Sequence, residues 1–563
     1  PQLVSGIGVG LLVTQQSTVA GDISNFGGLI TGLGTMSGLA GFAGTGVLLD
    51  GSSLLLGNLS NTGTILSSDG IAVALRGASS ITGSIINTSG GTIAGVTGIY
   101  VDAQSRILGG ISNTGLISGT IAAINNFGTI TGARDAIGMF GGTITGAIVN
   151  AGLIEGDRHG ISLSLTSIAG GVTNQGVISG VRGSGLVLGY QATVSGSVLN
   201  LSGGLIKGVE LRNNSTIVGA LNNAGVLLGS GVVTSVGSIS GDQSIAMIGQ
   251  GVVLNGTGLL SLSDTYTNSG SITNVGAAVF VDSRSTILGG IVNTGLITAS
   301  GMLVTSATIT GNQLVSGIGT GMNLNGGVMP GGNLSATGVV ISSDTLGGYQ
   351  TIAGVGVGAI AQLGTTTSAT LTNTSSLFGT GQVSLNSQAA GQTVTGVGVG
   401  LMVSSRSTIG GGIINSGAML SGVGYVSVAS ASSTALVSGV GVGLLVSNLS
   451  TVQGSIENSG IIVGTGVVSG AVAAAGTGLR IERNSVIIGG VTNTGMIQGV
   501  NGYGVALADN SSMSGTLVNA AGATIVGELA GIYVDTTSVI AGGISNSGVI
   551  SGTLASISNA GTI

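Results

Sequence analysis

The chain of 563 residues contains no cysteine and no tryptophan, only two prolines, and no more than seven tyrosines and six phenylalanines. Without cysteine no disulfide can stabilise the fold, and with so few aromatic rings the core must be thin and aliphatic. The missing cysteines fit a cytosolic chain and an exported one equally well, so they leave the cellular compartment open.

Charged residues are also scarce, at 5% of the chain against about 25% in ordinary soluble domains. Eleven Lys and Arg spread over this length release few counterions, so nucleic acid is not an expected partner. Residues 345–405 carry no charge, but Gly, Ser, Thr and Asn interrupt them too often for a transmembrane helix of about 20 apolar residues. We expect no membrane span in this segment.

Glycine is abundant, with 114 residues, and most of the apolar residues are Ile, Val, Leu and Ala, whose branched members favour half-buried strands. The chain also repeats itself. A unit containing Gly-Gly-Ile-Ser-Asn-Thr-Gly recurs, with variations, at 98–119, 279–297, 478–499 and 531–552. A second unit, Val-Ser-Gly-Val-Gly-Val-Gly-Leu-Leu-Val, occurs at 437–446 with near-copies at 4–13 and 394–403. Both units lead into Asn-x-Gly, so they share one repeat frame.

The spacing of the repeated asparagine indicates the length of one coil. Successive copies usually lie 23 to 27 residues apart, while the 13-residue interval from Asn113 to Asn126 predicts a half-coil and intervals of 35 to 45 residues predict insertions. Within a coil, Gly-Ile-Tyr-Val-Asp alternates with period two, which places Ile99 and Val101 inside and Tyr100 outside. The same pattern places Arg480 and Glu482 outside.

Two further short strands are expected at 107–111 and 116–117. The predicted fold is therefore all-β, a parallel β-helix (β-solenoid) with about three short strands per coil of roughly 25 residues. Residues 1–563 form a single continuous solenoid domain, with a loop or register change expected at 301–391. At about 4.8 Å per coil, roughly 22 coils make a rod about 100 Å long.

The repeated asparagine is predicted to form the corner of each coil, because Asn and Gly both tolerate the left-handed backbone conformation. Stacked amides could also hydrogen-bond from coil to coil as a ladder, as in cross-β assemblies; the alternative is a turn residue facing solvent. The candidate ladder residues are Asn87, Asn113, Asn150, Asn174, Asn293, Asn493, Asn519 and Asn546.

The segments Gly-Gly-Ile-Ser-Asn-Thr-Gly-Leu-Ile-Ser-Gly at 109–119 and Gly-Gly-Ile-Ser-Asn-Ser-Gly-Val-Ile-Ser-Gly at 542–552 resemble the repeats of bacterial autotransporter passenger domains and similar β-helical surface adhesins. The resemblance covers nearly the whole chain. It implies a right-handed parallel β-helix that is exported across an outer membrane and displayed at, or released from, the bacterial cell surface. An extracellular location is expected on that ground alone.

Candidate chemistry is sparse. The one histidine, His159, lies near Asp157, but no nucleophile motif surrounds any serine. The Gly-x-Gly runs at 6–10, 396–400 and 439–443 lack the helix and the lysine of a phosphate loop. No cysteine or histidine cluster suggests a metal. We therefore expect no catalytic, cofactor or metal site, although carboxylates around Asp135 and Asp157 keep a β-helical carbohydrate-active enzyme (polysaccharide lyase or hydrolase-like) as the alternative.

One group of basic residues follows the coil spacing. Arg134, Arg158 and Arg182 each come eight residues after a repeated asparagine, and Lys207 comes seven residues after Asn200. Neighbours in such a column repel unless something offsets their charge. The column is a candidate site for an anionic ligand such as a surface glycan; the alternative is a charge-balanced solvated face with the nearby acids Asp135, Glu155, Asp157 and Glu210.

The favoured function is a structural or adhesive extracellular surface protein that forms a rigid rod or a head-to-tail fibre. Neither end of the sequence looks capped, which predicts either further coils of the same protein or stacking of copies. No enzyme activity is expected.

Overall fold

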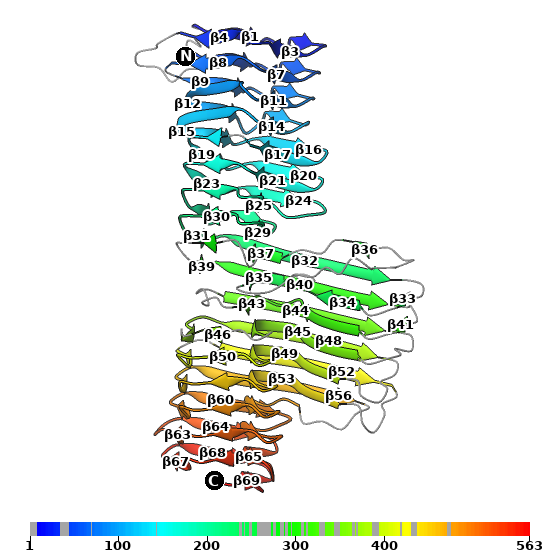
Figure 1. The fold of residues 1–563 in the computed structure, drawn as a ribbon, viewed down its shortest axis with the longest axis vertical. Coiled ribbons are helices and arrows are strands. Elements are labelled where there is room, and N and C mark those ends of the chain that lie inside the picture. The colour runs from blue at the N-terminus through cyan, green and yellow to red at the C-terminus, as the bar shows by residue number, and fades with distance from the viewer. Residues whose placement is uncertain are drawn as a thin grey trace. The chain divides into compact units, whose positions relative to one another are not determined.

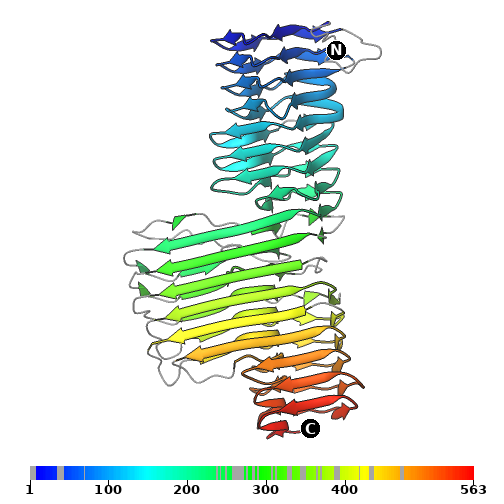
Figure 2. The ribbon, with the colours of Figure 1, turned by 180° about the vertical axis from the view of Figure 1, so that it is seen from behind.

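The computed structural model consists of strands and turns, with no helix among the residues it describes. Contacts divide the chain into two compact units, Pro1–Leu227 with Arg284–Gly295, and Leu228–Ser283 with Leu296–Ile563. Figures 1 and 2 show each unit as a stack of strands, with longer strands in the second unit. The described residues are 8–33, 44–68, 70–141, 143–235, 239–240, 243–246, 250–255, 272–273, 277–281, 286–287, 291–293, 295–305, 309–310, 313–325, 333–342, 350–362, 366–367, 370–385, 393–416, 419–429, 436–469 and 475–563.

One coil of the first unit contains four short strands, β5 (Val47–Leu49), β6 (Leu54–Leu55), β7 (Leu59–Asn61) and β8 (Thr64–Ser67). Each strand pairs in parallel with its equivalent in the next coil, which confirms the predicted parallel β-helix. The coil has one strand more than expected. The stretch 107–111 is divided into β13 (Arg106–Ile107) and β14 (Ile111–Asn113), because Gly110 turns the chain with φ of +88°.

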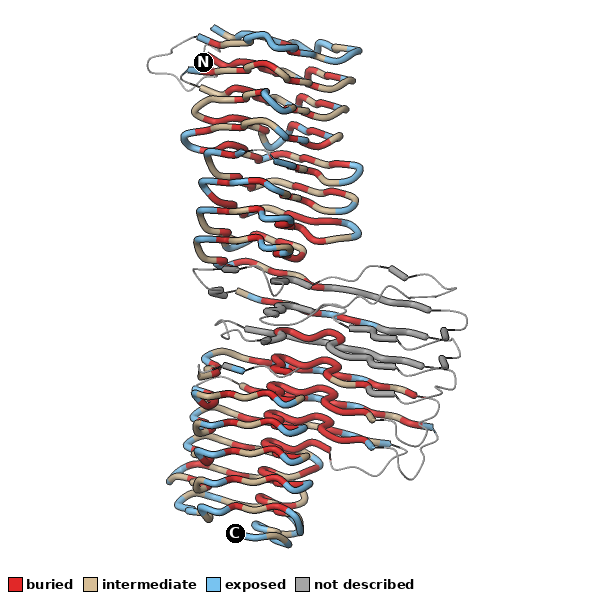
Figure 3. The backbone as a smooth tube through the Cα atoms, viewed as in Figure 1, coloured by how far each residue is buried: buried red, intermediate tan, exposed pale blue. Residues whose placement is uncertain are grey.

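The interior is aliphatic, and in most of the coils whose burial is described the buried positions follow the inner side (Figure 3). Ile99 and Val101 are fully buried while Tyr100 is half-buried, as the alternation predicts. Isoleucines stack on isoleucines: Ile65 pairs with Ile93, and Ile93 with Ile117. Such columns of like side chains fill the narrow interior without aromatic rings.

A half-coil does lie between Asn113 and Asn126. Asn113 ends β14 and pairs with Met139 of β17 (Asp135–Phe140). Asn126 ends β15 (Leu116–Asn126) and pairs with Val101 on one side and Asn150 on the other. After the extra half-coil, the column of asparagines continues on a different sheet of the stack, since Asn113 pairs with Asn87 and Asn126 pairs with Asn150.

The second unit contains wider coils. Its repeated asparagines Asn373, Asn415 and Asn458 lie 42 and 43 residues apart. The added residues lengthen two strands in each coil, for example β49 (Thr393–Val403) and β52 (Met419–Val428). The predicted insertions are therefore real, and they build an extension with its own core, which includes Val397 and Val426. The expected loop or register change at 301–391 falls partly outside the described residues; the rest of that range belongs mainly to strands of these wide coils.

The Gly-Val-Gly-Val-Gly segments lie inside the long strands β45 (Gln350–Ala361), β49 and β53 (Leu436–Val446). Gly396 and Gly398 have φ of +64° and +62°, and a Cβ on Gly398 would lie 1.8 Å from the carbonyl oxygen of Val423 in β52. Only glycine permits this approach. The segment separates the core of the extension from a second buried cluster, which includes Val399 and Met402.

Candidate functional site

The repeated asparagines form hydrogen-bonded ladders along the stack. The Nδ2 of Asn150 donates to the Oδ1 of Asn174 at 2.7 Å, and its Oδ1 accepts from the Nδ2 of Asn126 at 2.7 Å. The same Nδ2 also donates to the carbonyl oxygens of Gly152 and Val177. Side-chain bonds of this kind join Asn25–Asn61–Asn87–Asn113, Asn126–Asn150–Asn174–Asn200–Asn223 and Asn373–Asn415–Asn458–Asn493–Asn519–Asn546.

These Asn ladders are buried, apart from the exposed Asn546. The solvent-facing alternative is therefore excluded for the buried positions. The backbone of Asn293 pairs in register with Asn223, while its side chain lies outside the described residues. Within a ladder, most amide donors meet acceptors above and beside them, which satisfies polar groups inside an apolar stack, whereas the buried Oδ1 of Asn126, at the start of its ladder, has no hydrogen-bond partner among the described residues.

The predicted left-handed asparagine corner is wrong. None of the ladder asparagines described has a positive φ. The glycine of Asn-x-Gly is needed mostly for a different reason: a Cβ on Gly152 would lie 2.0 Å from the carbonyl oxygen of Gly128 in the adjacent coil. Left-handed residues instead occur as pairs at another corner, such as Asn213–Asn214 and Asp509–Asn510.

That other corner carries a second ladder, made of buried serines, which the sequence analysis missed. The backbone N–H of Ser450 donates to the Oγ of Ser485, and the N–H of Ser485 donates to the Oγ of Ser511. Similar bonds join Ser53, Ser79 and Ser105 in the first unit. Serine is so common in this chain that its spacing gives no clear signal; only its position two residues before a buried Ile, Val, Leu or Met distinguishes these serines.

Three members of the basic column do lie in consecutive coils. The N–H of Arg158 donates to the carbonyl oxygen of Arg134, and the N–H of Arg182 donates to that of Asp157. All three arginines are exposed. Acidic residues lie beside two of them. The Nε of Arg134 is 3.7 Å from the Oδ2 of Asp135, and the Nε of Arg182 is 3.4 Å from the Oδ1 of Asp157. The column is thus partly charge-balanced.

Lys207 is bound differently. Its N–H donates to the carbonyl oxygen of Ile178, which sets its backbone beside Ser179 rather than Arg182. Its Nζ donates to the carbonyl oxygens of Gly180 and Val181 at 2.8 and 2.9 Å. Burial lowers the pKa of Lys207 below its usual range, and Glu155 opposes this. Lys207 therefore stabilises the turn before Arg182 more than it offers a charged group to a ligand.

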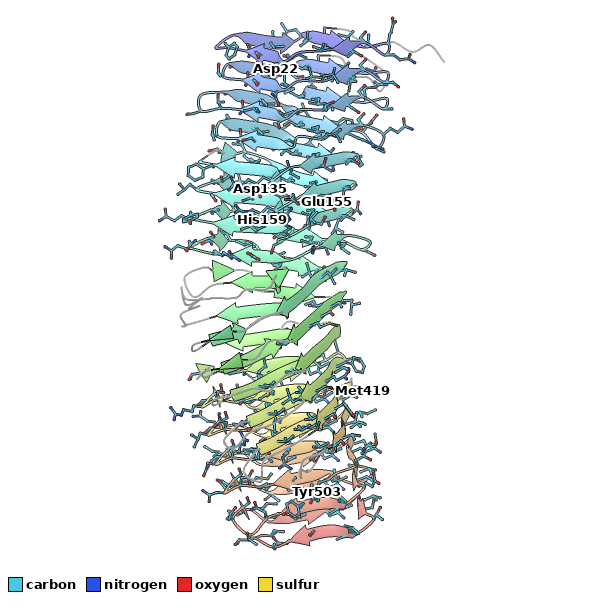
Figure 4. All side chains as sticks on the ribbon, turned by 90° about the vertical axis from the view of Figure 1, so that its right-hand side faces the viewer. Asp22, Asp135, Glu155, His159, Met419 and Tyr503 are labelled. Carbon is cyan, nitrogen blue, oxygen red and sulfur yellow. The ribbon has the colours of Figure 1, made fainter. Side chains whose placement is uncertain are left out.

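His159 lies beside these arginines, in register with Asp135 of the preceding coil. Figure 4 shows Asp135, Glu155 and His159 grouped on neighbouring coils. The Nδ1 of His159 accepts the backbone N–H of Ser184, and the hydroxyl of Ser184 donates to Glu210 instead of to the histidine. Burial lowers the pKa of His159, followed in size by the charge of Arg158. Asp135, His159 and Ser184 are thus brought together, but their hydrogen bonds do not form an activated serine.

Comparison with protein-family models, with curated proteins and with solved structures found no match to this chain in any of the three.

The described residues also contain no group of three or more His, Cys, Asp or Glu side chains placed to hold a metal ion. None of their elements is a helix long and apolar enough to cross a membrane.

Arg480 and Glu482 form a buried ion pair, although the alternation predicted both to face solvent. Arg480 is in register with the buried Leu445 of the last wide coil, so the broader neighbour covers it. Burial alone would lower the pKa of Arg480, but the charge and hydrogen bond of Glu482 raise it overall. Burial alone would raise the pKa of Glu482, and Arg480 lowers it overall. The side chains of Arg480 and Glu482 therefore both stay charged where the wide coils are followed by narrow coils.

Proposed function

We propose that this chain is a structural or adhesive protein of the bacterial cell surface, in which stacked coils supply rigidity and reach. The observation that carries the proposal is the pairing of a continuous aliphatic core with buried Asn ladders. Each ladder hydrogen bond contributes about 0.5–1.5 kcal/mol net, and the same contact recurs at nearly every coil. A stack built this way resists local opening along its length.

The extracellular location rests on the repeats that resemble autotransporter passenger domains. A chain with few charges and no cysteine needs no reducing or strongly ionic environment, which is compatible with display outside the cell. Further coils of the same protein, or copies stacked head to tail, are the proposed partners, since the edge of a terminal coil offers unpaired backbone groups to the opposite end of another stack.

Negative-stain electron microscopy over a range of concentrations, together with attachment of chain-coated polystyrene beads to cultured epithelial cells, tests this proposal. We expect elongated particles and attachment above that of albumin-coated beads. Round particles without attachment would overturn it. Release of reducing ends from pectin or hyaluronan would favour the carbohydrate-active alternative instead.

The exposed arginines are the proposed contact for an anionic surface glycan. Arg158 has no ion pair shorter than 4 Å among those described, and Arg182 has 77% of its side chain exposed. Heparin-agarose is the probe. Retention of the chain should weaken when Arg158→Ala and Arg182→Ala are combined, whereas combining Arg106→Ala and Arg406→Ala, which removes two exposed arginines outside the column, should leave retention close to that of the unaltered chain.

A further inference from the structure

The wide coils of the second unit carry a flat parallel sheet whose outer side is covered by no other element of the described part of the chain. Its strands are β40 (Leu296–Thr305), β44 (Asn333–Ser342), β48 (Leu377–Leu385), β52 and β56 (Ile461–Ser469), paired in continuous register. Figure 2 shows them as a ladder of long arrows, coloured green to orange, with no other element drawn over them. None of the five strands contains a charged residue.

Side chains largely alternate between the two sides of this sheet, most regularly in β48. In β48, residues 377, 379, 381, 383 and 385 are buried, while Phe378, Thr380 and Gln382 are exposed. Many inward positions are glycine because the opposite sheet approaches closely; a Cβ on Gly424 would lie 2.3 Å from the backbone nitrogen of Gly441. None of the outward positions is charged.

The outward residues form columns across the strands. Gln382, Tyr425 and Val467 pair in register as one column, and Thr380, Val423 and Thr465 form the next. The exposed apolar members keep a large part of their surface in water: Met302 38%, Phe378 39%, Tyr425 41%, Val423 44% and Val467 47%. We call this surface, defined by the outward residues of β40, β48, β52 and β56, the flat face.

The size of the flat face matches one side of a stable protein interface. Five strands at about 4.8 Å and nine to ten residues at about 3.3 Å span roughly 24 by 30 Å, or about 700 Å². Specific interfaces bury about 800 Å² from each partner. Exposed tyrosine, phenylalanine and methionine are also the residues that interface cores favour, while charged residues are depleted there.

We propose that the flat face binds the flat face of a second copy of this chain, side by side and related by a two-fold axis. A two-fold contact places the central Thr380–Val423–Thr465 column against itself, and the outer columns against each other. Because neither copy brings a charge, no like-charge pair forms and no buried ion needs a partner. Two pleated sheets then pack at about 10 Å, as in a β-sandwich.

This contact is separate from head-to-tail stacking, and the two are distinguishable by mass. Pairing of flat faces closes at a dimer, whereas stacking through coil edges continues to larger species. The inference does not depend on the proposed adhesive function, which bead attachment tests independently.

Sedimentation velocity of the full chain from about 1 to about 100 µM tests the pairing. We expect a monomer–dimer equilibrium that Val423→Arg weakens at least about 100-fold, because the two new charges would face each other across the axis. Val218→Arg is the matched control: Val218 is a valine of the first unit with 43% of its surface exposed, against 44% for Val423. It should leave the equilibrium unchanged.

A covalent test follows from the absence of cysteine. Under mild oxidation, Thr380→Cys or Thr465→Cys should form a disulfide-linked dimer, and Val218→Cys should not. Dimers that survive Val423→Arg unchanged would overturn the proposal, as would a chain that stays monomeric throughout. Binding of that monomer to phosphatidylcholine vesicles or insoluble cellulose, lost in Val423→Arg, would assign the flat face to a lipid or a glucan instead.

Discussion

At the scale of single residues, the Asn ladders are the contacts on which the stack depends most. Replacing Asn150 with Ala removes its bonds to Asn126 and Asn174 and leaves the buried Oδ1 of Asn174 without the donor it has in the ladder, while the Nδ2 of Asn126 keeps the carbonyl oxygens of Gly128 and Leu153. We expect Asn150→Ala to cost about 1–3 kcal/mol, because an orphaned buried polar group costs about that much. Urea unfolding of the first unit, monitored by hydrogen exchange, measures this loss of stability as a shift of the urea midpoint.

The matched control is Asn222→Ala, which replaces an exposed asparagine on the outer side of β31 (Leu221–Asn223). A surface change of this kind should stay within about 0.5 kcal/mol. Equal effects of the two substitutions would mean that the ladder bonds add nothing beyond a solvated side chain.

His159 gives the chain a specific dependence on pH. Burial and Arg158 lower its pKa in the folded state, while Asp135, Glu210 and the N–H of Ser184 oppose this. The unfolded chain therefore binds the proton more readily, and stability should fall as pH drops from about 6.5 toward the lowered pKa, then level off. His159→Gln should remove this part of the pH dependence of unfolding. Because the chain has no other histidine, an unchanged profile would contradict the assignment.

At the scale of elements, the left-handed glycines of the Gly-Val-Gly-Val-Gly strands are what allow two sheets to meet. Gly398→Ala would place a Cβ 1.8 Å from the carbonyl oxygen of Val423 at a φ of +62°. We expect a loss of more than about 2 kcal/mol, measured by the thermal midpoint of the second unit. Gly189→Ala in β25 (Leu186–Gly189) is the control, since the nearest atom there is 3.7 Å away, and it should be almost neutral.

The coil itself could be predicted from the sequence because its signal is periodic. Alternation placed Ile99 and Val101 in the core, and the spacing of Asn113 and Asn126 revealed a half-coil. Alternation failed at Arg480, because burial there depends on the width of the neighbouring coil and not on the residue's own strand. The alternation of residues predicts which side of a strand a residue occupies, but it does not predict which other residues cover that side.

The basic column shows the same limit. The equal spacing after the repeated asparagines correctly predicted that Arg134, Arg158 and Arg182 are aligned. These arginines lie 24 residues apart, so equivalent residues of successive coils stay in register. Lys207 departs from it, because its own strand, β28 (Leu205–Ile206), pairs with Val177–Ile178 and so aligns it with Ser179. The Ser ladder was not predicted, because serine is so common in this chain that its spacing gives no clear signal.

At the scale of the whole molecule, each coil contacts mainly its neighbours, so stability should be a sum of local terms instead of one cooperative quantity. The two compact units have separate internal contacts, and the extension of wide coils adds a core that the first unit lacks. We therefore expect differential scanning calorimetry to resolve more than one transition.

The substitutions above assign those transitions. Asn150→Ala should lower only the transition of the first unit, and Gly398→Ala only that of the second, because the two sites lie in different units. Hydrogen exchange should show the same division, with faster exchange confined to the coils next to each change. If both substitutions shifted a single transition by the same amount, the coils would be coupled along the entire chain, and a nearest-neighbour description of this solenoid would have to be abandoned.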